Sequence, residues 1–133
     1  MANPGCYPTA SILGLAPAVK AGIVELDIIV DAKSGGAGAG QKVARDYMYS
    51  EVNENVFAYA LGGHRHLPEI TQELAPLSSK PLNLTFLTHL IPMTRGILSS
   101  CYATLTEPGR WTGDEGKQKM LDLYRDYYAG DPF

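Results

Sequence analysis

Apolar residues recur at helical spacing near both ends of the chain. Over 8–21 they stand three or four positions apart, which predicts a helix that begins in the first turn with a proline. Over 114–129, Met, Leu and Tyr side chains fall on one helical face, and we expect a second helix there. A short third helix is expected to open at Pro68 and to stop at Pro76.

Four other stretches have the pattern of strands. A run rich in Ile and Val predicts a buried strand over 26–31, and apolar residues predict another over 56–60. Apolar and polar residues alternate over 82–86 and over 97–106, as they do in strands with one buried face. The dipeptide Pro108–Gly109 then predicts a turn.

These elements follow one another without a strict β-α-β rhythm. The order favours an α+β fold in which helices cover one face of a mixed, largely antiparallel sheet. The other face carries Thr, Ser and Tyr, and is either solvated or used for docking. A chain of 133 residues is long enough for one such domain.

Composition excludes several classes of protein. The chain is 45% hydrophobic with a net charge of −3, so it is a globular domain without the basic field of a nucleic-acid binder. The longest strongly apolar run is 28–30, so we expect no membrane span, and Met1–Gly5 lacks the regions of a signal peptide. The two cysteines, Cys6 and Cys101, form no disulfide framework or CxxC motif, and reduced thiols in the cytoplasm are expected.

Cys6 is the first candidate for chemistry. It stands between Pro4–Gly5 and Pro8, immediately before the first predicted helix. The amides and the dipole of a helix N-terminus stabilise an anion, which lowers the pKa of a thiol and favours a nucleophile. The alternative is a buried structural cysteine, which is also our interpretation of Cys101 in the middle of a predicted strand.

Two histidines follow a glycine pair and precede the short helix. In an extended segment His64 and His66 point the same way and Arg65 points oppositely, so the histidines share one site. A thiolate enzyme needs a proton donor and acceptor near pH 7, which histidine supplies. The alternatives are a solvated loop or a metal site with Glu69; the metal site lacks a convincing further ligand, and we expect none. The isolated His89 is expected to be structural.

The stretch 34–40 consists almost entirely of glycine and alanine and predicts a loop. It is not a phosphate loop, because both the Walker and the GxGxxG patterns require a residue other than Gln41. Such a loop permits close backbone approach to a flat ligand, or acts as a hinge, or is simply a flexible surface loop. Arg95, before a predicted strand, could bind a carboxylate or phosphate or be a surface charge.

Taken together, five segments resemble the catalytic domain of the N-acetyl-gamma-glutamyl-phosphate reductase family. They occur in the family's order and at similar spacing, and they cover nearly the whole chain. The segments are Asn3–Thr9, Ser34–Gly40, Glu51–Asn55, His64–Ile70 and Pro92–Leu98. The chain departs from the family pattern at Ala37, where a serine is common, and at Leu67, where a threonine is common.

The resemblance implies an activity and a fold. The family reduces N-acetyl-L-glutamyl 5-phosphate with NADPH to the semialdehyde and phosphate, in arginine biosynthesis. Cys6 would form a thioester, and one of His64 or His66, with His66 favoured, would be the acid/base. The fold would be the α+β domain found at the C-terminal end of glyceraldehyde-phosphate dehydrogenases. Whether a related acyl phosphate of the lysine pathway is the substrate stays open.

The resemblance also implies roles for other residues. Substrate binding or ordering of the site would involve Asn3, Arg65, Glu69 and Arg95. The nicotinamide end of NADP(H) would approach Ser34, Gly35, Gly38 and Gly40.

The family's dinucleotide-binding Rossmann domain has no counterpart here, so we expect residues 1–133 to be the catalytic domain alone. NADP(H) would then be bound mainly by the missing domain, which is a required partner beside the small-molecule substrate. A homo-oligomer is expected, with no nucleic-acid or membrane partner. The alternatives are a cysteine hydrolase, which would need neither NADPH nor a second domain, and a non-catalytic dimerisation domain contacting its copy through 97–106 and the last helix.

Overall fold

The computed structural model describes residues 3–40 and 44–132. Met1 and Ala2 of the N-terminal segment, Gln41 of the phosphate-loop comparison and Phe133 lie outside the described residues.

Four strands form one mixed sheet in the order β2-β3-β1-β4. The central pair, β1 and β3, is parallel, and both outer pairs are antiparallel. This confirms the predicted α+β class with a mixed, largely antiparallel sheet. The strands are β1 (Asp27–Ser34), β2 (Phe57–Tyr59), β3 (Asn83–Leu90) and β4 (Ile97–Tyr102).

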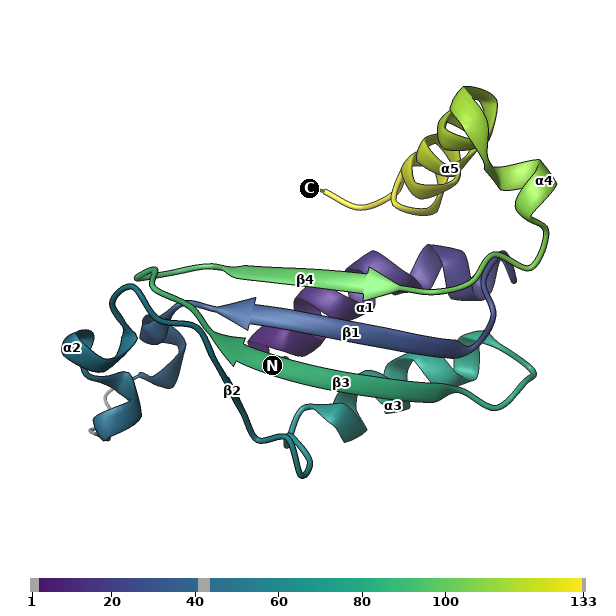
Figure 1. Cartoon of the computed structure of the whole chain (residues 1–133). Helices are drawn as coiled ribbons and strands as arrows, with labels where there is room; N and C mark the ends of the chain where they lie inside the picture. Colours follow the sequence, from purple (N-terminus) through teal and green to yellow (C-terminus); the bar gives the residue numbers. More distant parts are fainter. Residues whose placement is uncertain (1–2, 41–43, 133) are drawn as a thin grey trace.

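Helices cover one face of this sheet. Figure 1 shows α1 and α3 lying behind the strands, while α5 stands beyond the β4 edge. The helices are α1 (Cys6–Lys20), α2 (Tyr49–Val52), α3 (Leu67–Leu74), α4 (Pro108–Trp111) and α5 (Gly113–Tyr127). Single 3₁₀ turns complete the chain at Gly36–Ala39, Arg45–Tyr47 and Ala75–Leu77.

The core lies between the sheet and these two helices. Ile28, Val30 and Ala32 alternate along β1 and are completely buried, as the apolar run predicted. Ile70 and Leu74, one turn apart on α3, pack against them. No helix of the described part of the chain is long and apolar enough to span a membrane.

A proline explains how α5 attaches to α1. Pro17 lies inside α1 and has no N–H, so it leaves the carbonyl of Leu13 without its helical donor. The hydroxyl of Tyr128 donates to that carbonyl at 2.7 Å, and Tyr124 donates to the carbonyl of Gly14 at 2.6 Å. Tyr128 therefore supplies the donor that the Leu13 carbonyl lacks, and both hydroxyls attach the C-terminal helix to α1.

Several boundaries differ from the sequence expectations. The helix predicted over 8–21 begins earlier, at Cys6, because the extended backbone of Gly5 already serves as its N-cap. The strand predicted over 97–106 ends at Tyr102, and the following residues instead bond to the segment after α1, where Glu25 N–H donates to Thr104 at 2.7 Å.

The expectations at two prolines have different outcomes. Pro108–Gly109 opens the short helix α4, since proline is compatible with the first turn of a helix. Pro76 ends α3 as expected, but the chain continues from Leu74 into a 3₁₀ turn.

Replacing Gly116 by alanine is expected to destabilise the C-terminal helices. A Cβ at this buried position would lie 2.3 Å from the carbonyl carbon of Trp111, so backbone must move. We expect a loss of about 1–3 kcal/mol in the free energy of unfolding, measured by urea denaturation. The matched control is Gly14→Ala in α1, where a Cβ meets no atom within 4 Å and a gain of up to about 1 kcal/mol is expected. Equal effects of the two substitutions would contradict the packing argument.

Candidate functional site

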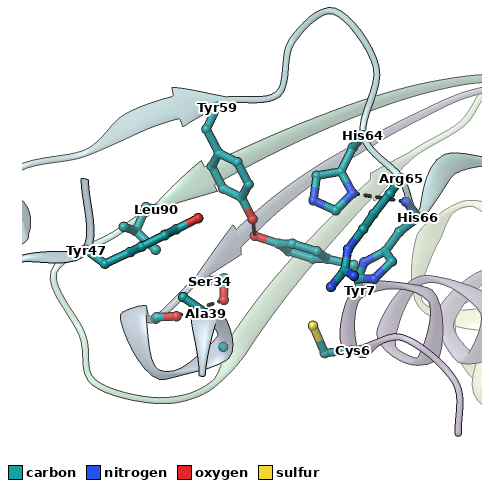
Figure 2. Close-up of a pocket in the computed structure, with 12 residues that line it drawn as sticks. Cys6, Tyr7, Ser34, Ala39, Tyr47, Tyr59, His64, Arg65, His66 and Leu90 are labelled. Atoms are coloured by element: carbon teal, nitrogen blue, oxygen red, sulfur yellow. Dashed lines mark hydrogen bonds between the residues drawn. The ribbon is translucent and has the colours of Figure 1, made fainter. Parts of the chain in front are cut away.

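The candidate residues meet where the N-terminus of α1 approaches the carboxyl end of β1. A cavity of about 450 Å³ opens there, and Figure 2 shows the side chains that enter it. Its lining comes from six separate parts of the chain: Cys6, Tyr7, Ser34, Gly35, Gly38, Ala39, Tyr47, Tyr59, His64, Arg65, His66 and Leu90.

Cys6 is the first residue of α1 and its thiol is exposed in this cavity. The N–H groups of a first helical turn have no acceptor within the helix, and Cys6 lies in that turn. Cys101 differs in every respect, because it lies on β4, is partly buried beside Ser99, and burial raises the pKa of its thiol. Of the two cysteines, only Cys6 is placed as a nucleophile would be.

Both histidines line the cavity with Cys6, and their ring centroids are 4.8 Å apart. His64 also stabilises the turn that carries it, because its Nδ1 accepts the backbone N–H of His66 at 3.1 Å. His66 is buried at the N-cap of α3, and its Nε2 lies against Gly5, where a Cβ would approach it to 2.7 Å. The contact with the residue before Cys6 favours His66 for proton transfer.

The pKa values of both imidazoles are lowered. Burial is the main cause in each; His66 and Arg65 lower the pKa of His64 further, and Arg65 does the same to His66, while Glu69 opposes it. Since the ordinary value is about 6.5, both rings are neutral at pH 7 and able to accept a proton.

These shifts predict a loss of stability in mild acid. Below about pH 6.5 the histidines of the unfolded chain are protonated, whereas those of the folded chain stay neutral because their pKa values are lowered. The free energy of unfolding therefore decreases as the pH falls from above about 6.5 toward the lower pKa values of the folded state. We expect the free energy of unfolding, from urea denaturation, to fall between pH 7.5 and 5.5. The fall should be smaller in His64→Asn/His66→Asn, because asparagine does not titrate. An unchanged slope in this variant would contradict the prediction.

Arg65 does not point away from the histidines, as an extended segment would require. Residues 64–67 form a turn in which the N–H of Leu67 bonds to the carbonyl of His64 at 3.0 Å. The turn brings Arg65 into the cavity beside His66, as Figure 2 shows. The sequence-based expectation of opposite directions was wrong, because it assumed strand geometry.

The other predicted residues lie around Cys6 in neighbouring cavities. Arg95 lines one of about 430 Å³ together with Cys6, Gly35 and Gly38. Asn3 and Glu69 line another, of about 500 Å³, together with Cys6, Arg65 and His66. Gly40 lies outside the linings of these described cavities and ends the 3₁₀ turn with a φ of 65°.

The glycine stretch predicted as a loop is a 3₁₀ turn pressed against the segment before β4. The N–H groups of Gly35 and Gly36 bond to the carbonyls of Gly96 and Met93 at 3.0 and 3.1 Å. A Cβ on Gly35 would lie 2.7 Å from the carbonyl oxygen of Met93, so only glycine permits this approach. The contact joins two motifs that are about 60 residues apart, and it carries Arg95 to the site.

The tyrosines of the cavity were not predicted from the sequence. The hydroxyls of Tyr7 and Tyr59 are 2.8 Å apart, and burial raises the pKa of both, so they remain protonated donors. Tyr7 could have been predicted as a cavity residue, because it directly follows Cys6 in the sequence. Nothing in the sequence indicates that Tyr59, on β2, and Tyr47 reach the same wall.

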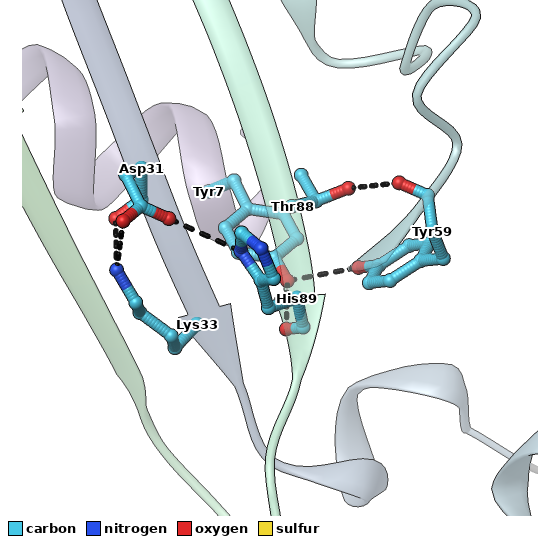
Figure 3. A network of polar contacts seen from close by, with 6 residues as sticks. All are labelled: Tyr7, Asp31, Lys33, Tyr59, Thr88 and His89. Atoms are coloured by element: carbon cyan, nitrogen blue, oxygen red, sulfur yellow. Dashed lines mark hydrogen bonds and ion pairs between the residues drawn. The ribbon is translucent and has the colours of Figure 1, made fainter. Parts of the chain in front are cut away.

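Figure 3 shows a network of polar contacts that links Tyr7 to β3 through the carbonyl of His89. His89 lies within 3.1 Å of Asp31, which also pairs with Lys33, on the face of the sheet opposite the helices. Among residues 3–40 and 44–132, no cluster of three or more His, Cys, Asp or Glu side chains is placed to hold a metal ion.

Comparisons with known proteins identify relatives of the whole chain. A family model described as "Semialdehyde dehydrogenase, dimerisation domain" matches residues 6–133. Proteins named N-acetyl-gamma-glutamyl-phosphate reductase from Citrifermentans bemidjiense and Geotalea daltonii are 51% and 52% identical over 135 aligned residues, and that of Moorella thermoacetica is 46% identical over 134. Each alignment includes 100% of this chain but only 37% of the relative's length.

Proposed function

Because the chain belongs to the family of semialdehyde dehydrogenase dimerisation domains, we propose that it is the substrate domain of an N-acetyl-gamma-glutamyl-phosphate reductase. Such an enzyme of arginine biosynthesis converts N-acetyl-L-glutamyl 5-phosphate and NADPH to the semialdehyde, NADP⁺ and phosphate. The observation that carries the proposal is the exposed Cys6 thiol at the start of α1, in one cavity with two neutral histidines and Arg65.

The first half of the reaction needs only residues of this chain. The Cys6 sulfur attacks the acyl carbonyl carbon, the C–S bond forms, and phosphate leaves with the electron pair of the broken C–O bond. The product is a thioester on Cys6. His66 removes the thiol proton before the attack, and Arg65 offers charge to an anionic group of the substrate.

NADPH, when bound, supplies the hydride that takes the thioester to the aldehyde level. The residues present fit a flat ring close to Cys6, because Gly35 and Gly38 leave that wall of the neighbouring cavity without side chains. The Cys6–carbon bond then breaks with its electron pair on sulfur, the aldehyde leaves, and His66 returns to that sulfur the proton that it removed in the first step. We propose that most of the NADP(H) site lies in a second domain, since the relatives are much longer than this chain.

We propose that the protein acts in the cytoplasm, where thiols are kept reduced. Two thiols without a disulfide agree with this proposal.

The acylation step can be tested on the chain by itself. Incubation with N-acetyl-L-glutamyl 5-phosphate, without NADPH, should release about one phosphate per chain and add one N-acetylglutamyl group to Cys6, as measured by intact mass and peptide mapping. Absence of the adduct would overturn the proposal. Continuous phosphate release without NADPH would favour the cysteine hydrolase instead.

The complete reaction requires the remaining part of the enzyme. We propose a chimera in which this chain replaces the corresponding segment of the Citrifermentans bemidjiense reductase, to which it is 51% identical. NADPH oxidation, followed at 340 nm with the acyl phosphate present, is expected in the chimera and not with the chain alone. Turnover by the chain alone would contradict the assignment of the cofactor to a second domain.

A second function, dimerisation, is favoured by the open face of the sheet. Within the described residues, α1 and α3 cover one face, whereas Ile29, Leu98 and Tyr102 expose 43%, 59% and 58% of their surface on the other. Ile29 is the register partner of Tyr102 on the neighbouring strand, and Leu98, opposite Lys33, lies four residues along the same face; we call these three side chains the patch. We propose that a second copy of the chain packs on this patch, as the family description suggests.

Sedimentation can locate this contact. We expect a dimer that Leu98→Lys dissociates, because the substitution places a charge in the patch. Leu121→Lys on α5, which exposes 53% of its leucine, is the matched control and should leave the dimer intact. If only Leu121→Lys dissociates the dimer, the contact lies on α5 and not on the sheet.

A further inference from the structure

Glu69 connects the helix that carries the nucleophile to the helix that carries the histidine. Its Oε1 accepts the backbone N–H of Gly5 at 2.9 Å, across 64 positions of the sequence. Gly5 is the N-cap of α1 and directly precedes Cys6. A side chain of α3 therefore supplies the acceptor for the backbone at which the nucleophile's helix begins.

His66 approaches the same point. His66 is the N-cap of α3 and Glu69 lies in its first turn, three positions later, so both side chains project from the same side of the helix. A Cβ on Gly5 would lie 2.7 Å from His66 Nε2 and 3.0 Å from Glu69 Oε2. The imidazole of His66 and the carboxylate of Glu69 thus both pack against the backbone of Gly5. A side chain at position 5 would leave no room for them.

We propose that Glu69 is a positioning residue that holds His66 and the Cys6 end of α1 in fixed relation, rather than a group that binds substrate. Its catalytic meaning rests on the proposed function. The charge of the substrate argues against direct binding, because an acyl phosphate with a carboxylate is anionic and a glutamate would repel it. The hydrogen bond to Gly5 already occupies one of the two carboxylate oxygens.

Other groups also face His66, and their effect on its pKa has to be considered when its protonation is measured. From the preceding turn these are His64 and Arg65, and from α1 they are Cys6 and Tyr7. Among the charged groups, Arg65 lowers the pKa of His66 while Glu69 raises it. Removing the charge of Glu69 without changing its shape should therefore lower the pKa of His66 further.

Two substitutions separate the hydrogen bond from the charge. Glu69→Gln retains a side-chain oxygen for the N–H of Gly5, whereas Glu69→Ala removes both oxygen and charge. Glu73→Gln is the matched control, because this exposed glutamate lies one turn further along α3 and its carboxylate accepts from Gln72, whereas the N–H of Gly5 bonds to Glu69. NMR titration of His66, hydrogen exchange of the Gly5 amide and the rate of Cys6 acylation are measured for each.

In Glu69→Gln we expect the His66 titration to move to lower pH, with an acylation rate at pH 7.5 within about threefold of the unsubstituted chain. In Glu69→Ala we expect faster exchange of the Gly5 amide and acylation slowed by about 10²-fold, the loss that a misplacement of about 1 Å produces. Glu73→Gln should change none of these. If Glu69→Ala does not fold, Glu69→Gln still decides through the titration.

Two results would overturn the proposal. One is a His66 titration in Glu69→Gln that matches that of Glu73→Gln. The other is a raised half-saturating concentration of acyl phosphate in Glu69→Gln with an unmoved titration, which would make Glu69 a substrate ligand. If the unsubstituted chain is not acylated at all, the reductase assignment fails, but the titration and the amide exchange still test the positioning role.

Discussion

Replacement of Cys6 by serine is expected to slow the release of phosphate from N-acetyl-L-glutamyl 5-phosphate by at least about 10³-fold. A serine hydroxyl at the same place stays protonated near pH 7, and a neutral hydroxyl is a far weaker nucleophile than sulfur. The effect is measured as the phosphate released per chain, together with the mass of the acyl adduct.

Cys101→Ser is the matched control for this experiment. Cys101 lies partly buried on β4, and burial raises the pKa of its thiol, so it takes no part in the expected chemistry. We expect the control to be acylated at the rate of the unsubstituted chain. Loss of acylation in the control, or its persistence in Cys6→Ser, would show that the nucleophile is not Cys6.

The second large effect is expected at His66. His66→Asn should lower the rate of acylation at pH 7.5 by about 10²–10⁴-fold, the range of a lost general acid/base. The reason is position: the Nε2 of His66 lies against Gly5, and His66 shares two cavities with Cys6. His64→Asn is expected to slow acylation about tenfold or less, because His64 lines only one of these two cavities, that of about 450 Å³, and its Nδ1 already accepts the N–H of His66.

The pH profile distinguishes a proton-transfer role of His66 from a purely structural one. Its pKa is lowered, chiefly by burial, so the neutral, proton-accepting form persists below the ordinary value of about 6.5. The acylation rate should therefore fall on acidification with a midpoint below 6.5, and this limb should disappear in His66→Asn. A larger loss in His64→Asn than in His66→Asn would exchange the roles of the two histidines.

Much of the secondary structure could be predicted from local pattern. The apolar run of β1 and the polar alternation at the start of β3 are visible without any partner strand, because buried and exposed positions alternate with the pleat. Boundaries were harder, since they depend on partners. β4 ends at Tyr102 because later residues bond to 23–25, and no feature of 97–106 itself marks that change.

The site divides in the same way. Cys6 and the two histidines could be selected from residue type and from their place before predicted helices. The direction of Arg65 could not, because it depends on the turn at 64–67. Tyr59 was missed because its hydroxyl meets Tyr7 only through the pairing of β2 with β3.

The sequence by itself determined the fold class, the family and the types of reactive groups, because these follow from periodicity, motifs and side-chain chemistry. The tertiary structure alone decided which groups meet. Gly35 contacts the Met93 backbone, Glu69 bonds to Gly5, and His66 rather than His64 faces the start of α1. These contacts join segments far apart in the chain, and their distances are set by how helices and strands pack, which local pattern does not encode.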